Sequence, residues 1–240
     1  MSEQTYEQIG PKNVFDNGSL EWRLSKFNAK ERFALIQRIL GVHFLPHGDL
    51  LKEVIGEGFI PKPEEVFCAM DFHLDWLYAA LMNKEFVEGK AFPFESGAIT
   101  GKQQDVDFVL CFTDKARKET HLLLIEAKGY GSWDTAQIES KFNQYRAMKA
   151  AFDQNSDVKP RFILMSPVNP FEHPTPHNQK FREAVMAFTE FSAPPMWVKL
   201  EMQETFAVVR CRADATQTQV NPTHYKLKKR PWVYELDSGI

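Results

Sequence analysis

Two apolar segments joined by a short charged segment place the strongest constraint on the fold. Residues 106–112 and 121–127 are mostly apolar, whereas residues 113–120 between them carry five charged side chains. Strands linked by so short a connection pair antiparallel, because a parallel crossover needs about a dozen residues or more. We therefore expect a β-hairpin inside the sheet, with residues 113–120 as its loop.

The rest of the chain predicts helices around a sheet. Asn28 and Glu31 have capping-box spacing at the start of a helix that ends near Gly41. Apolar side chains at helical spacing predict further helices over residues 64–82, 135–152 and 181–191. Further strands are expected at residues 86–94, 161–165, 197–202 and 206–211. Hairpins combined with a strand-helix-strand crossover indicate an α/β class, with a mixed β-sheet flanked by helices.

The predicted elements divide the chain unevenly. We expect residues 1–60 to form an N-terminal helical extension and residues 61–240 to form the α/β domain. The net charge of −3 does not suit a strongly basic nucleic-acid-binding protein, so any such contact must be a local patch.

The cysteines and the apolar stretches bear on location. Cys68, Cys111 and Cys211 lack metal-ligand spacing and lie in apolar runs, which suits buried thiols in a reducing compartment. No apolar stretch approaches the roughly 20 residues of a membrane span, and residues 1–10 are polar. We therefore expect a cytoplasmic protein without a membrane partner.

The hairpin brings acidic residues together. If Phe112 pairs with His121, antiparallel counting places Asp107 opposite Glu126. Directly opposed side chains share one face of the sheet, with Cβ atoms about 4.5–5.5 Å apart. Two carboxylates at this separation repel each other unless a cation lies between them. The pattern therefore predicts a site for Mg²⁺, or for Mn²⁺ in its place.

A cationic side chain accompanies the acids. Lys128 lies one step beyond Glu126 on the same face, and the same counting places Asp105 near Lys128. A metal held by the carboxylates would polarise a phosphoryl oxygen and lower the pKa of a bound water. Lys128 would stabilise the charge that develops in the transition state. This combination predicts metal-dependent hydrolysis of phosphodiester bonds.

The same residues resemble a known family. Asp107 at the start of a hydrophobic strand, followed by Leu-Leu-Leu-Ile-Glu-Ala-Lys ending at Lys128, is similar to the core of the PD-(D/E)XK nuclease superfamily, which has the restriction-endonuclease-like fold. The resemblance covers residues 64–165. It implies that Asp107 and Glu126 bind the metal, that the backbone carbonyl of Ala127 helps, and that Lys128 assists the attacking water. It also implies an acid on the preceding helix, which is Asp75, with Asp71 as its substitute.

The sequence departs from the family pattern and leaves alternatives open. Val106 precedes Asp107 where the family name has proline, the helical acid is an aspartate where glutamate is usual, and Asp105 competes with Asp107. Glu126 and Lys128 also suit a surface ion pair, which contributes little to stability. The alternatives to a nuclease are a non-catalytic module that binds nucleic acid or another partner, and a hydrolase for another phosphorylated substrate.

Basic side chains suggest where a nucleic acid, expected to be DNA, would bind. Lys141, Arg146 and Lys149 follow the acidic residues on a predicted helix and are candidates for phosphate contacts. The basic run at residues 224–230, together with Trp232, suits phosphate contacts and base stacking, or simple solvation. A homodimer would supply two sites, which would allow both strands of a duplex to be cut.

Overall fold

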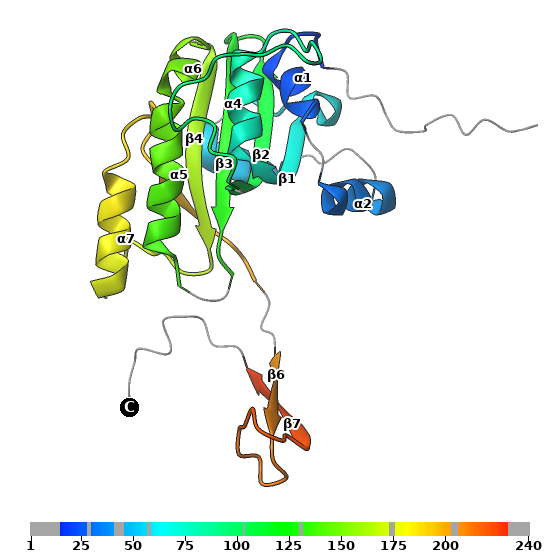
Figure 1. Ribbon diagram of the computed structural model, residues 1–240, viewed down its shortest axis with the longest axis vertical. Coiled ribbons are helices and arrows are strands. Elements are labelled where there is room, and N and C mark those ends of the chain that lie inside the picture. Colours follow the sequence, from blue (N-terminus) through cyan, green and yellow to red (C-terminus); the bar gives the residue numbers. More distant parts are fainter. Residues whose placement is uncertain are drawn as a thin grey trace, which may run out of the picture.

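The computed structural model describes an α/β protein built on a mixed sheet (Figure 1). It describes residues 15–27, 30–40, 46–56, 59–102, 104–129, 132–172, 176–202 and 206–229. The sheet has five strands in the order β1-β2-β3-β4-β5, and a separate two-stranded sheet pairs β6 with β7. The predicted class is confirmed: the mixed sheet is flanked by helices.

The strand directions bring several strand ends to one edge of the sheet. β1 (Phe67–His73), β2 (Asp105–Asp114) and β3 (Glu119–Ala127) are antiparallel neighbours. β4 (Val158–Ser166) runs parallel to β3, and β5 (Met196–Lys199) runs parallel to β4. Because β3, β4 and β5 point the same way, their carboxyl ends lie together, at the lower edge of the sheet in Figure 1.

The predicted hairpin register is confirmed. Phe112 pairs with His121, and Phe108 pairs with Ile125. The short charged connection explains this agreement, because the register of a hairpin is fixed by the length and type of its turn.

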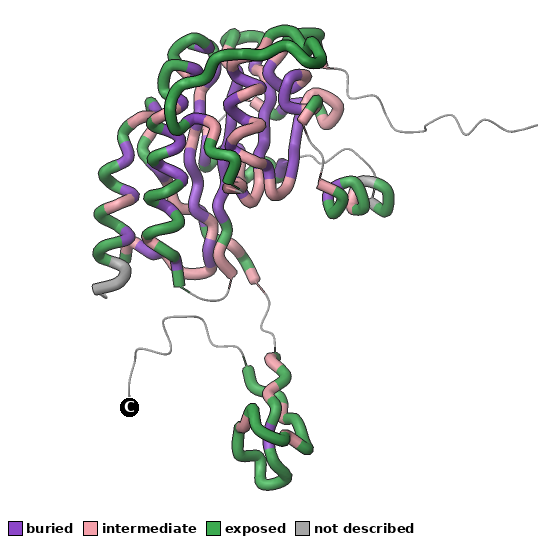
Figure 2. Tube along the Cα trace, in the orientation of Figure 1, coloured by how far each residue is buried: buried purple, intermediate pink, exposed green. Residues whose placement is uncertain are grey.

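Helices cover both faces of the sheet. The larger core lies under α1 (Leu20–Ser25), α4 (Leu74–Met82), α5 (Thr135–Ala147), α6 (Lys149–Asp153) and α7 (Pro176–Met186). The smaller core packs residues of α2 (Glu31–Leu40) and α3 (Gly48–Ile55) against the other face. The strands between these layers are buried along most of their length (Figure 2). Leu20 and Leu24 belong to the larger core, so α1 packs directly on the sheet layer.

One predicted helix is wrong over most of its length. Within residues 64–82, Pro63–Glu65 forms a 3₁₀ turn, Phe67–His73 forms β1, and the helix begins only at Leu74. Apolar residues at 66, 70 and 74 fit a helix, but residues 67–70 form a continuous apolar run that also fits a strand buried on both faces. Pairing with β2 buries that run, which outweighs the local helical spacing.

The strand predicted at residues 86–94 is also wrong. This segment is irregular, and Phe86, Phe92 and Phe94 are exposed. The two positions beside β2 are taken by β1 and β3, so this segment does not pair there.

The remaining predicted elements are confirmed with shifted ends. Residues 135–152 form α5 and α6 with a break at Met148, and 161–165 lies inside β4. The helix at 181–191 is α7, which begins earlier, and the strand at 197–202 is the shorter β5. Residues 206–211 form β6 (Phe206–Cys211) as predicted, whereas β7 (His224–Lys229) was not expected as a strand. Asn28 and Gly41 lie outside the described residues.

The three cysteines are free and buried in different places. Cys68 belongs to the smaller core, Cys111 belongs to the larger core, and Cys211 lies in β6. Burial raises the pKa of the Cys68 thiol to about 12 and raises the pKa of Cys111 as well. Over the described part of the chain, no helix has both the length and the apolar character needed to cross a membrane.

Candidate functional site

The hairpin places Asp107 beside the end of β3. Phe108 and Ile125 are paired, so Asp107 and Glu126 occupy the next positions on neighbouring strands. The Asp107 carboxylate (Oδ2) accepts a hydrogen bond from the Ala127 N–H at 2.8 Å, which holds it against β3. Alternation puts Asp107 and Glu126 on the α5 face, because Val109 and Leu124 belong to the larger core beneath those helices.

Glu126 is a buried acid with a buried basic partner. Glu126 is only 4% exposed, and Lys141 of α5 is 3% exposed. The Lys141 Nζ lies 2.5 Å from Glu126 Oε1. Each of the two buried groups compensates the charge of the other. Removal of either one would leave a buried, uncompensated charge.

The environment raises the pKa of Glu126 to about 7. Burial is the main cause, the charge of Lys141 opposes it, and the charges of Asp107 and Asp105 raise the pKa further. The positive charge of Lys141 therefore does not fully offset the cost of burying the ionised Glu126 carboxylate beside Asp107 and Asp105. A bound cation beside Asp107 would relieve this imbalance.

The three basic residues proposed as phosphate contacts lie in different environments. Lys141 faces the core, on a stripe with Ile138 and Tyr145. Arg146 is exposed and pairs with Glu190 at 2.8 Å. Lys149 is exposed and pairs with Asp153 at 2.9 Å. The three- and four-residue spacing of residues 138, 141 and 145 is the signal that would have placed Lys141 inside, but its charge suggested the surface.

Lys128 continues β3 past its last residue. Its N–H donates to the Met165 carbonyl oxygen at 2.8 Å, which extends the pairing with β4. By alternation its side chain starts on the same face as that of Glu126. A Cβ added to the following residue, Gly129, would lie 2.7 Å from the Met202 sulfur. The chain that leaves β5 therefore passes directly beside Lys128.

Asp75 anchors a loop. It lies in the first turn of α4, where Oδ1 accepts from the Thr100 N–H at 3.1 Å and Oδ2 accepts from the Gly101 N–H at 3.0 Å. The Gln144 amide donates to Oδ1 at 2.8 Å. These bonds tie Asp75 to the segment before β2 and to α5.

Asp71, the substitute for Asp75, lies in β1. The pairs Met70–Phe108 and Phe72–Val106 flank it, so its position is across from Asp107. Its φ of 50° is in the left-handed region, which aspartate adopts more readily than most residues. Asp71 was expected on a helix, but it lies in a strand, at the position across from Asp107.

Asp105 has partners of its own. Its two oxygens lie 3.0 Å from Lys30 Nζ and 3.0 Å from His73 Nδ1. Asp71, Asp105 and Lys30 line a polar cavity of about 340 Å³ together with Glu31 and Arg32. Asp105 thus takes part in an ion-pair network beside the acids, and Asp107 is the better-placed partner for Glu126.

A metal would have hard oxygen donors available here. The Asp107 and Glu126 carboxylates and the Ala127 carbonyl are ligand types that Mg²⁺ and Mn²⁺ prefer. Among the described residues, no group of three or more His, Cys, Asp or Glu side chains is arranged to hold a metal. The fit therefore rests on two carboxylates and a carbonyl, with water completing the shell, as is common for Mg²⁺.

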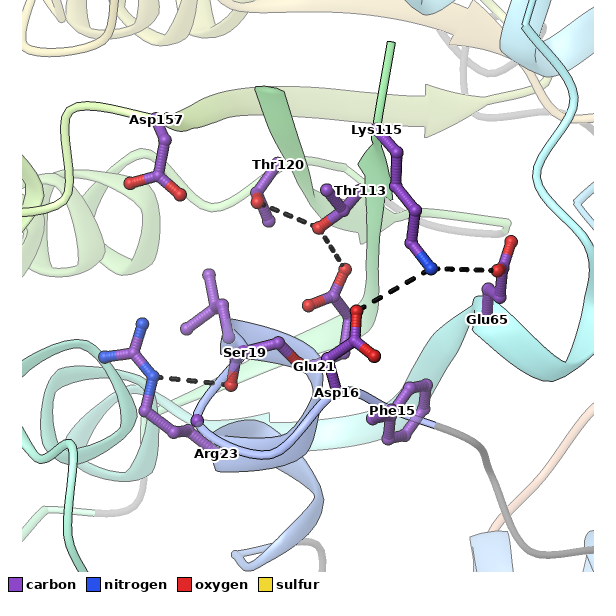
Figure 3. Close-up of a pocket in the computed structure, with 12 residues that line it drawn as sticks. Phe15, Asp16, Ser19, Glu21, Arg23, Glu65, Thr113, Lys115, Thr120 and Asp157 are labelled. Atoms are coloured by element: carbon purple, nitrogen blue, oxygen red, sulfur yellow. Dashed lines mark hydrogen bonds and ion pairs between the residues drawn. The ribbon is translucent and has the colours of Figure 1, made fainter. Parts of the chain in front are cut away.

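A second polar cavity, of about 290 Å³, lies near the hairpin loop (Figure 3). Glu21 is buried there and accepts a hydrogen bond from the Thr113 hydroxyl at 2.6 Å. Arg23 donates to the Leu81 carbonyl at 2.9 Å, and Lys115 pairs with Asp16 and Glu65. The Glu21–Thr113 bond ties α1 to β2, at the end of β2 and β3 away from Asp107 and Glu126, and the Arg23–Leu81 bond ties α1 to α4.

Comparison of the chain with protein-family models, curated proteins and solved structures gives no match, so the functional argument rests on the geometry and chemistry of these residues.

Proposed function

We propose that the protein is a metal-dependent nuclease of the PD-(D/E)XK type, with a restriction-endonuclease-like core formed by β1 to β4 and α5. The observation that carries the proposal is the Asp107 carboxylate, bound to the Ala127 N–H at 2.8 Å beside the buried Glu126. An antiparallel hairpin followed by a helix and a parallel strand supports the same assignment.

In this proposal Asp107, Glu126 and the Ala127 carbonyl hold Mg²⁺ or Mn²⁺. The metal supplies Lewis-acid polarisation of the phosphate and a more acidic bound water. Asp107 is oriented by its backbone hydrogen bond, and Glu126 is oriented by Lys141. Fixed ligands of this kind reduce the reorganisation needed when substrate binds.

The two lysines have separate roles in the proposal. Lys128 follows Glu126 at the end of β3, where its ammonium stabilises charge on the reacting phosphate. Lys141 is buried on α5 and contacts Glu126, so it positions the carboxylate. A lysine side chain has several rotatable bonds, and the packing around Lys141 restricts them to the conformation that contacts Glu126.

A cleavage assay tests the proposal. The full chain is incubated with supercoiled plasmid, linear duplex and single-stranded oligonucleotides, with Mg²⁺, with Mn²⁺ or with EDTA. Cleavage is expected only with metal, and Asp107→Asn, Glu126→Gln and Lys128→Ala should each lose at least 100-fold in rate, on the order of the loss from removing one transition-state contact. Glu88→Gln, in the exposed segment before β2, is the matched control and should cleave like the wild type.

Metal binding provides a readout that does not depend on finding the substrate. A ligand at 100 times its Kd raises the free energy of unfolding by about 2.7 kcal/mol. Mn²⁺ should therefore raise the melting temperature of the wild type but not that of Asp107→Asn. Equal stabilisation of both proteins would place the metal elsewhere.

A non-catalytic binding module is the second candidate. The observation in its favour is the Glu126–Lys141 contact, which already partly neutralises the buried acid without a metal. This candidate predicts nucleic-acid binding that is unaffected by EDTA and by Lys128→Ala, with no cleavage of any substrate form.

A further inference from the structure

The β6–β7 hairpin carries an exposed face of unusual composition. Its cross-strand pairs on that face are Phe206 with Lys229, Val208 with Leu227, and Arg210 with Tyr225. The four apolar side chains are between 57% and 70% exposed. Each aromatic ring thus lies opposite a cationic side chain, with an aliphatic pair between them.

The hairpin is basic, although the chain is not. Residues 206–229 contain five Lys or Arg side chains and a single acidic residue, Asp214, whereas the whole chain has a net charge of −3. Lys228 lies exposed on the opposite face of the ribbon. The hairpin is therefore a local cationic patch of the kind that attracts a polyanion.

The hairpin is tethered next to the candidate site. β5 ends at Lys199, which pairs with Ser166 at the edge where β3 ends. Met202 then packs against Gly129, beside Lys128, and only residues 203–205 separate Met202 from Phe206. Four residue steps span at most about 14 Å. The start of the hairpin is thus held close to the catalytic edge, and Figure 1 draws β6 and β7 beyond that edge.

We propose that the β6–β7 hairpin binds single-stranded nucleic acid and presents it to the site at the ends of β2 and β3. The inference rests on the proposed nuclease function and names its substrate class. Unpaired bases expose their faces and can stack on Phe206 and Tyr225, whereas the faces of paired bases are covered in a duplex. Arg210 and Lys229, on the same face as the two rings, contact the phosphates between stacked bases, and Lys228 on the opposite face adds to the positive charge that attracts the strand.

This arrangement has a defined energetic signature. Loss of one aromatic platform weakens single-strand binding about 5- to 150-fold, as expected for one stacked base. Each lost phosphate contact reduces the slope of log K against log salt by about 0.7. Loss of an aromatic ring therefore lowers the affinity, whereas loss of a cationic side chain also lowers the salt dependence of binding.

Fluorescence anisotropy with a labelled dT20 oligonucleotide, in EDTA so that no cleavage occurs, tests the proposal on the full chain. The variants are Phe206→Ala/Tyr225→Ala and Arg210→Ala/Lys229→Ala. The matched control is Lys84→Ala/Lys90→Ala, which removes two cations from the exposed segment after α4. Thermal melting checks that each variant retains the fold.

Each outcome decides between the claims. Tighter binding of dT20 than of a duplex of equal length, lost in the hairpin variants but not in the control, supports the proposal even if no cleavage is ever seen. Hairpin variants that bind and cleave as well as the wild type overturn it and leave the nuclease intact. Failure of the wild type to bind dT20 also overturns it. A dimer that dissociates on Val208→Lys, without any nucleic-acid binding, would assign this face to a second copy of the chain.

Discussion

Replacing Lys141 by methionine should show how much the buried Glu126 carboxylate lowers the free energy of unfolding when it has no basic partner. Methionine fills a similar apolar volume but leaves Glu126 without its basic partner. Removing one member of a buried ion pair costs about 3–5 kcal/mol, because the remaining charge is uncompensated. We expect Lys141→Met to lose about 2.4 kcal/mol of free energy of unfolding at pH 8, less than that range, because Glu126 takes up a proton in the variant.

The loss should depend on pH, since Glu126 can escape by binding a proton. Its pKa is raised from 4.5 to about 7 in the folded protein, so folded Glu126 holds a proton that the unfolded chain releases between these values. Stability contributed by this group is present below pH 4.5 and is lost as pH rises toward 7. Without Lys141 the folded pKa rises further, and the window of loss extends above pH 7.

The difference between the wild type and Lys141→Met should therefore open above pH 7. Each further pH unit adds about 1.4 kcal/mol until Glu126 ionises in the variant as well. Below pH 6 both proteins hold a neutral acid, and the difference should fall to about 1 kcal/mol, the contribution of one hydrogen bond. Urea unfolding at pH 6 and pH 8 measures both values.

The double variant Lys141→Met/Glu126→Gln is the control for charge. It carries no buried charge at this position, so it should be more stable than Lys141→Met at pH 8 and should show no added pH dependence. A loss in Lys141→Met that is below 1 kcal/mol at pH 8, or is equal at both pH values, would refute the reasoning.

Three further substitutions probe contacts around the site and the sheet. Asp75→Ala removes three hydrogen bonds and should cost about 1–2 kcal/mol, with faster hydrogen exchange at residues 100–101 but not in β4. Tyr145→Phe removes a buried hydroxyl that has no hydrogen-bond partner among the described residues, so it should raise stability by up to about 1 kcal/mol; a loss of 1 kcal/mol or more would show that the hydroxyl is bonded. Burial lowers the pKa of His121, so wild-type stability should fall as pH drops below 6.5, and His121→Phe should flatten that dependence in urea unfolding; an unchanged slope would contradict the assignment.

The hairpin of β2 and β3 was predictable because its pattern is redundant. The two apolar runs, the charged loop and the short length of the connection together indicate one antiparallel register, and that register places Asp107 beside Glu126. The end of β3 at Ala127 followed from the same counting.

Other features depend on contacts that no local pattern encodes. Residues 67–73 are compatible with a helix or a strand. Only the pairing with β2 and the burial of the strand between the two cores decide between them. Lys141 reads as a surface cation until the buried Glu126 is known to face it. The hydrogen bonds of Asp75 could not be predicted, because Thr100, Gly101 and Gln144 lie far from it in the sequence. β7 is a run of basic residues whose strand character comes from pairing with β6.

The scattered thiols give the molecule three built-in reporters. Cys111 lies beneath the main helical layer, Cys68 lies under α2 and α3, and Cys211 is enclosed by the appended hairpin. An alkylating reagent modifies a buried thiol only when its surroundings open. Mass spectrometry of timed alkylation would therefore show whether the two faces of the sheet and the hairpin come apart together or in sequence.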